Sequence, residues 1–235
     1  MTPAAALAAL RLPAAALVGE AVPKQAILDR LKPAADRRLA RERLRKLVFV
    51  ARLTPLSCAI PAGDGADALT VALATVDAPT PAPGLPKLLH RLVPHPMLLL
   101  EQSPPTGGGD AELLRLTARG VRCVLPTAHA ADLLAALAPS GVSGGDVDLS
   151  AVLRRWRLAV ATADAAALTG VFAWDPSADP DALAADCAEL RGLDATIRGL
   201  QGKARREKQP GVRAELNAGL REARGRQASL LDRLR

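Results

Sequence analysis

The chain has 235 residues, of which 49% are hydrophobic and only 2% aromatic, and its formal net charge is +7. This length suits one domain with an appendage, or two small domains, and the apolar share suits an aliphatic core with few aromatic platforms for stacking on bases. The cysteines Cys58, Cys123 and Cys187 form neither a CxxC pair nor a Cys/His cluster. We therefore expect no disulfide framework, no zinc site and a reducing, cytoplasmic environment.

The positive charge is concentrated in two segments. Residues 30–52 hold nine Lys and Arg against two acidic residues, and residues 201–235 hold ten against four, whereas residues 53–200 are net acidic. Such clustering is typical of contact with a polyanion or an acidic partner, and a solvated helix surface is the alternative. Arg11 and Pro13 interrupt the apolar start, and no uncharged apolar run approaches the ~20 residues of a membrane span. We therefore expect neither a secretory signal nor a membrane partner.

Residues 1–21 show no clear pattern, and a small α/β domain is expected over 22–138. Its start, VPKQAILDRL, predicts a short helix opened by Pro23. A basic amphipathic helix is predicted from residue 34 to just before Pro55, because apolar residues recur there every three or four positions. The apolar positions that define this helix are Leu39, Leu44, Leu47, Val48 and Ala51.

Several strands are expected in the rest of this domain. Two surround a Gly/Asp turn, and a third is a compact apolar run. The stretch AELLRLTARGVRCVL is ambiguous between strand and helix, and a strand pair that turns at Arg119-Gly120 is favoured. These strands are predicted at 58–60, 69–76, 96–103 and within 111–125, with a short helix at 87–92. Strands interleaved with helices predict an α+β fold built on a small mixed α/β domain.

The segment 139–147 is rich in Gly and Ser and is predicted to be a linker. A Trp-bearing helix and a turn are expected over 148–178, with Asp148 or Ser150 as the N-cap and Gly170 at the end of the helix. Trp156 stands among three arginines. It could stack on a base between them, but the apolar residues on neighbouring turns favour a place in the core.

Residues 179–235 predict an antiparallel coiled-coil-like hairpin. Apolar residues recur there at coiled-coil spacing in two runs that are out of phase. Pro210 would cost ~3 kcal/mol inside a helix, so two helices that fold back at KQPG explain the pattern better than one rod. The first run is Leu183, Cys187, Leu190, Leu193, Ile197, Leu200 and Ala204; the second is Leu216, Leu220, Ala223, Gln227, Leu230 and Leu234.

The stretch KARREKQPGVRAELN (203–217) becomes the tip of this hairpin and concentrates cations there. Three interpretations stay open: a solvated turn, a contact with nucleic-acid phosphates, or docking on an acidic protein. The candidate phosphate contacts are Arg37, Arg38, Arg41, Arg45, Arg205, Arg206, Lys208 and Arg213. The candidates for binding a partner helix along the seam are Leu190, Ile197, Leu200, Leu216, Leu220 and Leu230.

At REKQPGVRAELNAGL the chain resembles a bacterial family, domain of unknown function 4391. Stretches of similar look and order are VPKQAIL, TPLSCAIPAG, LPKLLHRLVPHPMLLLEQ and LTGVF, so the resemblance covers nearly the whole chain. It implies a small α/β domain with a charged coiled-coil-like tail. It also implies an accessory role beside methyltransferases and helicases of restriction or anti-phage defence systems. Pro210-Gly211 departs from the family pattern, in which a helix-compatible or basic pair is expected.

Catalytic motifs are scarce in this sequence. A nuclease core of the restriction type needs an acid on one strand and an acid-x-Lys on the next, to hold Mg²⁺ and activate water. Asp77 and Glu101 end two predicted strands, but Ser103 stands where the lysine is needed. His90 and His95 lack a third zinc ligand nearby, and PTGGGD lacks the lysine of a phosphate loop. We therefore expect no metal and no cofactor.

These patterns together predict a non-enzymatic accessory or scaffold subunit of a bacterial DNA-processing assembly that contacts DNA phosphates through basic helices. The expected partners are methyltransferase or helicase subunits and non-specific DNA, and a homo-oligomer is compatible with the seam. Two alternatives stay open: a purely protein-binding coiled-coil scaffold, and a divergent Mg-dependent nuclease.

Overall fold

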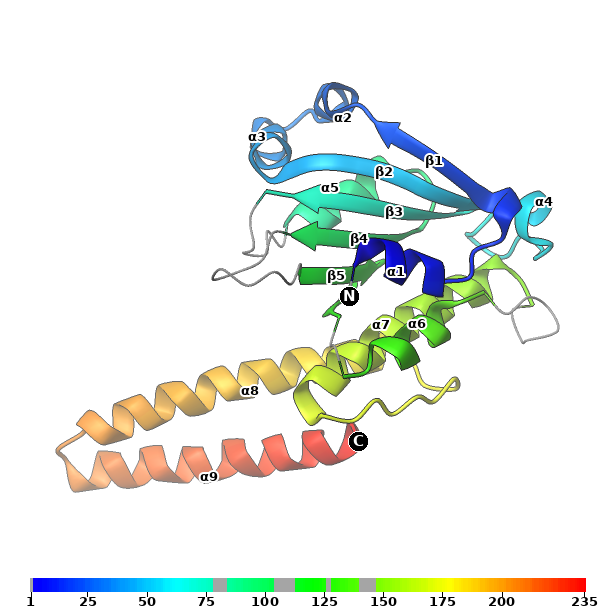
Figure 1. The fold of residues 1–235 in the computed structure, drawn as a ribbon. Helices are drawn as coiled ribbons and strands as arrows, with labels where there is room; N and C mark the ends of the chain where they lie inside the picture. The colour runs from blue at the N-terminus through cyan, green and yellow to red at the C-terminus, as the bar shows by residue number, and fades with distance from the viewer. Residues whose placement is uncertain (1, 78–83, 104–112, 126–127, 140–146) are drawn as a thin grey trace.

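The structure is a computed structural model that describes residues 2–77, 84–103, 113–125, 128–139 and 147–235 (Figure 1). The described residues form an α+β fold with one six-stranded sheet, whose strands lie in the order β1 to β6. Neighbouring strands are antiparallel except β3 and β4, which are parallel. The strands are β1 (Leu17–Val22), β2 (Leu44–Leu53), β3 (Leu69–Val76), β4 (Met97–Ser103), β5 (Leu113–Ala118) and β6 (Val121–Val124).

Helices cover both faces of the sheet and build two hydrophobic cores. One core lies under α2 (Lys24–Arg30), α3 (Ala34–Arg43) and α5 (Gly84–Leu92). The other lies under α1 (Pro3–Ala9), α6 (Ala130–Leu137) and α7 (Leu149–Thr169). Two short elements, η1 (Ala14–Ala16) and α4 (Pro55–Cys58), complete this part of the chain. No helix in the described residues is long and apolar enough to span a lipid bilayer.

Helix α7 begins and ends at the predicted residues. The Asp148 side chain accepts a hydrogen bond from the Ala151 backbone at 2.8 Å, and Gly170 ends the helix in the left-handed conformation with φ +78°. Trp156 is fully buried in the core beneath the sheet, and its indole Nε1 donates to the Leu137 carbonyl at 2.9 Å. Trp156 is therefore a core residue and does not stack on a ligand.

The predicted basic helix is half wrong, because residues 44–53 form strand β2 and only the first ten residues form α3. The pairing of β2 with β3 shifts register twice, once after Leu44 and once before Ala51. Each bulge inserts one residue and so changes which face the following side chains occupy. The first leaves Leu44 and Leu47 in the α5 core, and the second moves Ala51 and Leu53 into the α7 core. Apolar spacings of three and four therefore arise here from a bulged strand.

Two smaller predictions also need correction. Residues 58–60 are not a strand: α4 ends at Cys58, and Ala59 takes the left-handed conformation with φ 55°. The start of the chain, which shows no clear pattern, contributes α1 and the edge strand β1. The strands at 69–76 and 97–103 and the strand pair around Arg119-Gly120 are confirmed. The linker predicted at 139–147 lies mostly outside the described residues.

The predicted hairpin is confirmed as α8 (Pro180–Arg206) and α9 (Pro210–Arg233), which run side by side and extend away from the sheet (Figure 1). Asp179 caps α8 by accepting a hydrogen bond from the Asp181 backbone, and Pro210 opens α9 at its first turn. Proline at that position loses no helical hydrogen bond, so the residue that forbids one long rod also starts the returning helix.

Candidate nucleic-acid interface

All eight predicted phosphate-contact residues are exposed, but they lie in two separate places. Arg37, Arg38 and Arg41 lie on α3, and Arg45 lies on the bulged start of β2. Arg205, Arg206, Lys208 and Arg213 surround the turn between α8 and α9. Helix α3 packs beside β2, whereas α8 contacts β6 at the far end of the sheet. The structure therefore separates the two basic patches.

The α3 patch is partly neutralised by its own helix. The Arg38 guanidinium bonds the Glu42 carboxylate one turn later at 2.7 Å, and this bond raises the pKa of Arg38. Lys24 of α2 donates to the Arg41 carbonyl at 2.8 Å, so its ammonium lies at the end of α3. This patch is a short helix surface of mixed sign.

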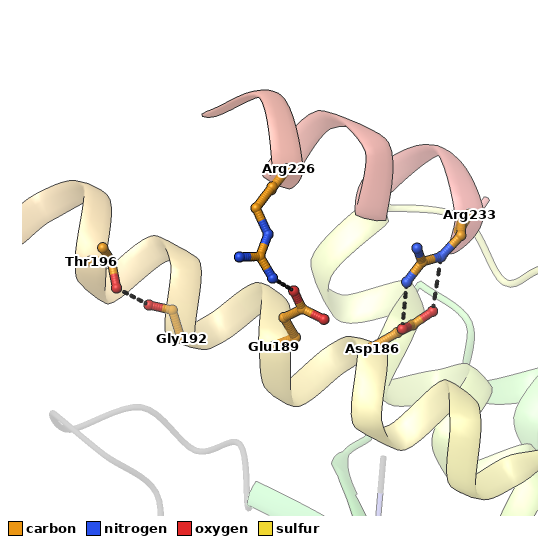
Figure 2. A network of polar contacts seen from close by, with 6 residues as sticks. All are labelled: Asp186, Glu189, Gly192, Thr196, Arg226 and Arg233. Carbon is orange, nitrogen blue, oxygen red and sulfur yellow. Dashed lines mark hydrogen bonds and ion pairs between the residues drawn. The ribbon is translucent and has the colours of Figure 1, made fainter. Parts of the chain in front are cut away.

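One side of the hairpin is held together by ion pairs between its two helices, and Figure 2 shows them. The Arg226 guanidinium bonds Glu189 at 2.6 Å, and Arg233 bonds both carboxylate oxygens of Asp186, at 2.6 and 3.3 Å. The bond to Asp186 raises the pKa of Arg233. Every arginine here has an acidic partner on the facing helix. We call this surface the paired side, defined by Asp186, Glu189, Arg226 and Arg233.

The opposite side of the hairpin carries arginines without such partners. On α8, Arg198 and Arg205 are seven residues apart and so share one helix face. On α9, Arg213, Arg221 and Arg224 share one face too, because Asn217 between the first two completes a spacing of four, four and three residues. All of them are exposed, and none makes an ion pair with a described residue. We call this surface the basic side, defined by Arg198, Arg205, Arg213, Arg221 and Arg224.

Two contacts show that these sets lie on one side of the hairpin and opposite the ion pairs. Gln227 of α9 donates to Asp194 of α8 at 2.5 Å, and Asp194 lies one helical turn from Arg198. Gln227 is likewise one turn from Arg224. The Asp194–Gln227 bond therefore lies beside the basic side, whereas Arg226 and Glu189 meet on the other edge of the seam.

The register of the two helices brings the arginines of the basic side to matching levels. The Leu200 side chain lies against Gly219 of α9. Arg205 lies five residues beyond Leu200 on α8, and Arg213 lies six residues before Gly219 on α9. Both steps lead toward the turn, so Arg205 and Arg213 lie at about the same level. Moving two residues in the other direction along each helix brings Arg198 level with Arg221. The basic side therefore consists of two rows of cations, one on each helix.

At the base of the hairpin the row on α8 is neutralised. Arg191 lies seven residues before Arg198, but it makes two bonds to Asp164 of α7, at 2.8 and 2.5 Å, which raise its pKa. A pocket of about 290 Å³ opens beside this pair, lined also by Arg115, Arg122, Cys123 and Val124. Arg191 thus fixes α8 to α7, and the unpaired row begins at Arg198.

The two acids considered for a nuclease lie on or just beyond the neighbouring parallel strands β4 and β3, and their surroundings differ. Glu101 is buried and accepts a hydrogen bond from Arg122 at 3.0 Å; burial raises its pKa, and Arg122 and Arg115 oppose that rise. Asp77 is exposed, beyond the end of β3. Among the described residues no three His, Cys, Asp or Glu side chains form a metal-binding group. The carboxylate of Glu101 is bound to a guanidinium.

The six predicted partner-binding residues lie along the seam between α8 and α9. Leu190 and Leu230 are buried together near α7, and Ile197 and Leu220 are buried together further toward the turn. Leu200 packs against that second cluster, and Leu216 is half-buried. Five of the six, all but Leu216, therefore pack in clusters within the chain.

Sequence reasoning missed three members of the basic side: Arg198, Arg221 and Arg224. The choice of candidates followed local charge density around the turn, and these three lie outside that stretch. The seven-residue interval from Arg191 through Arg198 to Arg205 is the signal that would have found the row on α8. No family model, curated protein or solved structure matches the chain.

Proposed function

We propose that the chain is a non-enzymatic accessory subunit of a DNA-processing assembly and that it holds DNA through the phosphate backbone. The observation that carries this proposal is the basic side of the hairpin, five exposed arginines without an acidic partner among the described residues. Two acids of α8, Glu189 and Asp186, pair with Arg226 and Arg233 on the other side. Arginines without such partners are available to phosphates.

The energetic contribution of these arginines is counterion release. Each phosphate that an arginine neutralises frees condensed cations from the DNA, so affinity falls steeply as salt rises. Such contacts position the protein on DNA and carry no sequence information. The arginines of α3 form a second, separate contact surface in this proposal.

The wider context is taken from the family resemblance described above. On that resemblance we propose that the chain works beside methyltransferase or helicase subunits of restriction or anti-phage defence systems. The seam leucines pack inside the hairpin, so a protein partner would dock on another surface. Nothing in the arrangement of Asp77 and Glu101 favours a nuclease over this proposal.

The test is a binding titration of the full chain on duplex DNA at two salt concentrations. We expect the logarithm of the affinity to fall with the logarithm of the salt concentration with a slope of about −4.5, for five contacts. The double variant Arg205→Gln/Arg213→Gln should reduce that slope by about two. The matched control is Arg226→Gln/Arg233→Gln, which removes the same charge from the paired side and should leave the slope nearly unchanged. Absence of binding at low salt would overturn the proposal.

A further inference from the structure

We infer that the basic side of the hairpin fits double-stranded rather than single-stranded DNA. This inference rests on the proposed function and names the form of the nucleic acid. Its basis is the arrangement of the arginines in two parallel rows, Arg198 and Arg205 on α8 and Arg213, Arg221 and Arg224 on α9.

The spacing of the rows is set by helix geometry. Packed helices lie about 8–10 Å apart, which sets the separation of the two rows. At about 1.5 Å per residue, Arg198 and Arg205 lie about 10.5 Å apart along α8, and the row on α9 extends about 16.5 Å from Arg213 to Arg224. A duplex presents two phosphate strands on the two borders of each groove, and the major groove is about 12 Å wide. Each row of arginines can therefore follow one strand. A single strand has no second backbone at a fixed distance, so it must lose conformational freedom to reach both rows.

The chemistry of the hairpin points the same way. Proteins that hold single strands combine a basic groove with aromatic side chains on which the bases stack. No Phe, Trp, Tyr or His occurs after Trp174, so the hairpin has no such platform. Trp174 itself stacks on Phe172 at 6.3 Å between ring centroids and packs against the core under the sheet. What remains on the hairpin surface is cationic and suited to phosphates alone.

The seam holds the two rows in a fixed relation. Ile197, Leu220 and Ala223 are buried between the helices, and the Asp194–Gln227 bond closes the edge next to the basic side. Because the side chains of the seam are packed, the separation of the rows is set before DNA binds. Preorganisation of this kind favours a partner whose two phosphate strands are themselves held at a fixed distance.

The experiment compares a labelled duplex of about 24 base pairs with each of its two strands, using the full chain at low salt. We expect the duplex to bind about tenfold tighter than either strand, with a steeper salt slope. The variant Arg213→Gln/Arg221→Gln/Arg224→Gln removes the row on α9 and should bring the duplex and single-strand affinities to within about twofold of each other.

The matched control is Arg226→Gln/Arg233→Gln/Arg235→Gln, which removes three arginines that already have acidic partners and should preserve the preference for the duplex. Equal or tighter binding of a single strand by the unaltered chain would overturn the inference and leave the proposed function standing. Binding of neither form would overturn both. Circular dichroism of each variant checks that the helices are retained.

Discussion

The two sides of the C-terminal hairpin are built from the same residue type on the same two helices, yet their surroundings differ. On the paired side, Arg226 and Arg233 meet Glu189 and Asp186 across the seam. On the basic side, none of the five arginines forms an ion pair with an acidic side chain among the described residues; Arg198 bonds only the backbone carbonyl of Asp194. If stability alone mattered, the arginines on both sides would have acidic partners. The number of arginines on a surface therefore says little about whether they can bind phosphates. Their position relative to the acidic side chains decides whether they are available.

An acid placed among the arginines of the basic side should remove the difference between the two sides. Asn217 is exposed and lies four residues from both Arg213 and Arg221, so Asn217→Glu would pair with them on the helix surface. We expect the salt slope of DNA binding to fall by about two, although no arginine has been removed. Each new pair should also stabilise the helix by about 0.2–0.5 kcal/mol, so binding and stability would change in opposite directions.

The control for this variant is Ser229→Glu. Ser229 is exposed on the same helix and lies three residues from Arg226 and four from Arg233, so it adds the same charge beside the paired side. Its DNA binding should remain close to that of the unaltered chain. An equal loss of affinity in both variants would show that net charge, and not the basic side, governs binding.

The opposite change should turn the paired side into a second basic surface. Asp186→Asn with Glu189→Gln leaves Arg233 and Arg226 without their carboxylates, and both arginines are largely exposed. We expect the salt slope to steepen by about one, since the new surface faces away from the first and only part of it can reach the same DNA. Titration at three salt concentrations measures this change. An unchanged slope would mean that DNA contacts only one side of the hairpin.

The hairpin itself follows from local signals in the sequence. Asp179 marks the start of α8, Pro210 marks the start of α9, and the seam spacing gives the buried positions. Each of these features acts within one or two turns of helix, so no tertiary information is needed. The basic side was found only in part, because Arg205 and Arg213 lie in the charged turn while Arg198, Arg221 and Arg224 lie beyond it. Which side of the hairpin an arginine occupies depends on the register of two helices.

Strand β2 shows why other parts of the fold were not predictable. A helix and a strand with two bulges can bury residues at the same intervals of three and four, as Leu44, Leu47 and Ala51 do. The pattern is then ambiguous, and the pairing with β3 decides it. The β-branched and aromatic residues Val48, Phe49 and Val50 were the local sign of a strand.

The smallest expected effect comes from two glycine substitutions that should change the stability of the hairpin but not its affinity for DNA. Gly199 and Gly225 are exposed helix residues, and a methyl group added at either position would meet no neighbouring atom within 4 Å. Gly→Ala at each position should therefore raise the free energy of unfolding by about 0.4–1 kcal/mol, by restricting the unfolded chain. DNA affinity should not change, because both positions lie away from the basic side. Denaturant unfolding together with a DNA titration measures the two quantities.

Gly170 provides the contrast for that variant. It ends α7 with φ +78°, a conformation that alanine adopts only with strain, so Gly170→Ala should destabilise the chain even though space is available for the methyl group. If the stabilised hairpin also bound DNA more tightly, order in the helices would limit affinity. The two rows of arginines would then not be fixed in place before DNA arrives, and the contrast between the two sides would depend on flexibility as well as on charge.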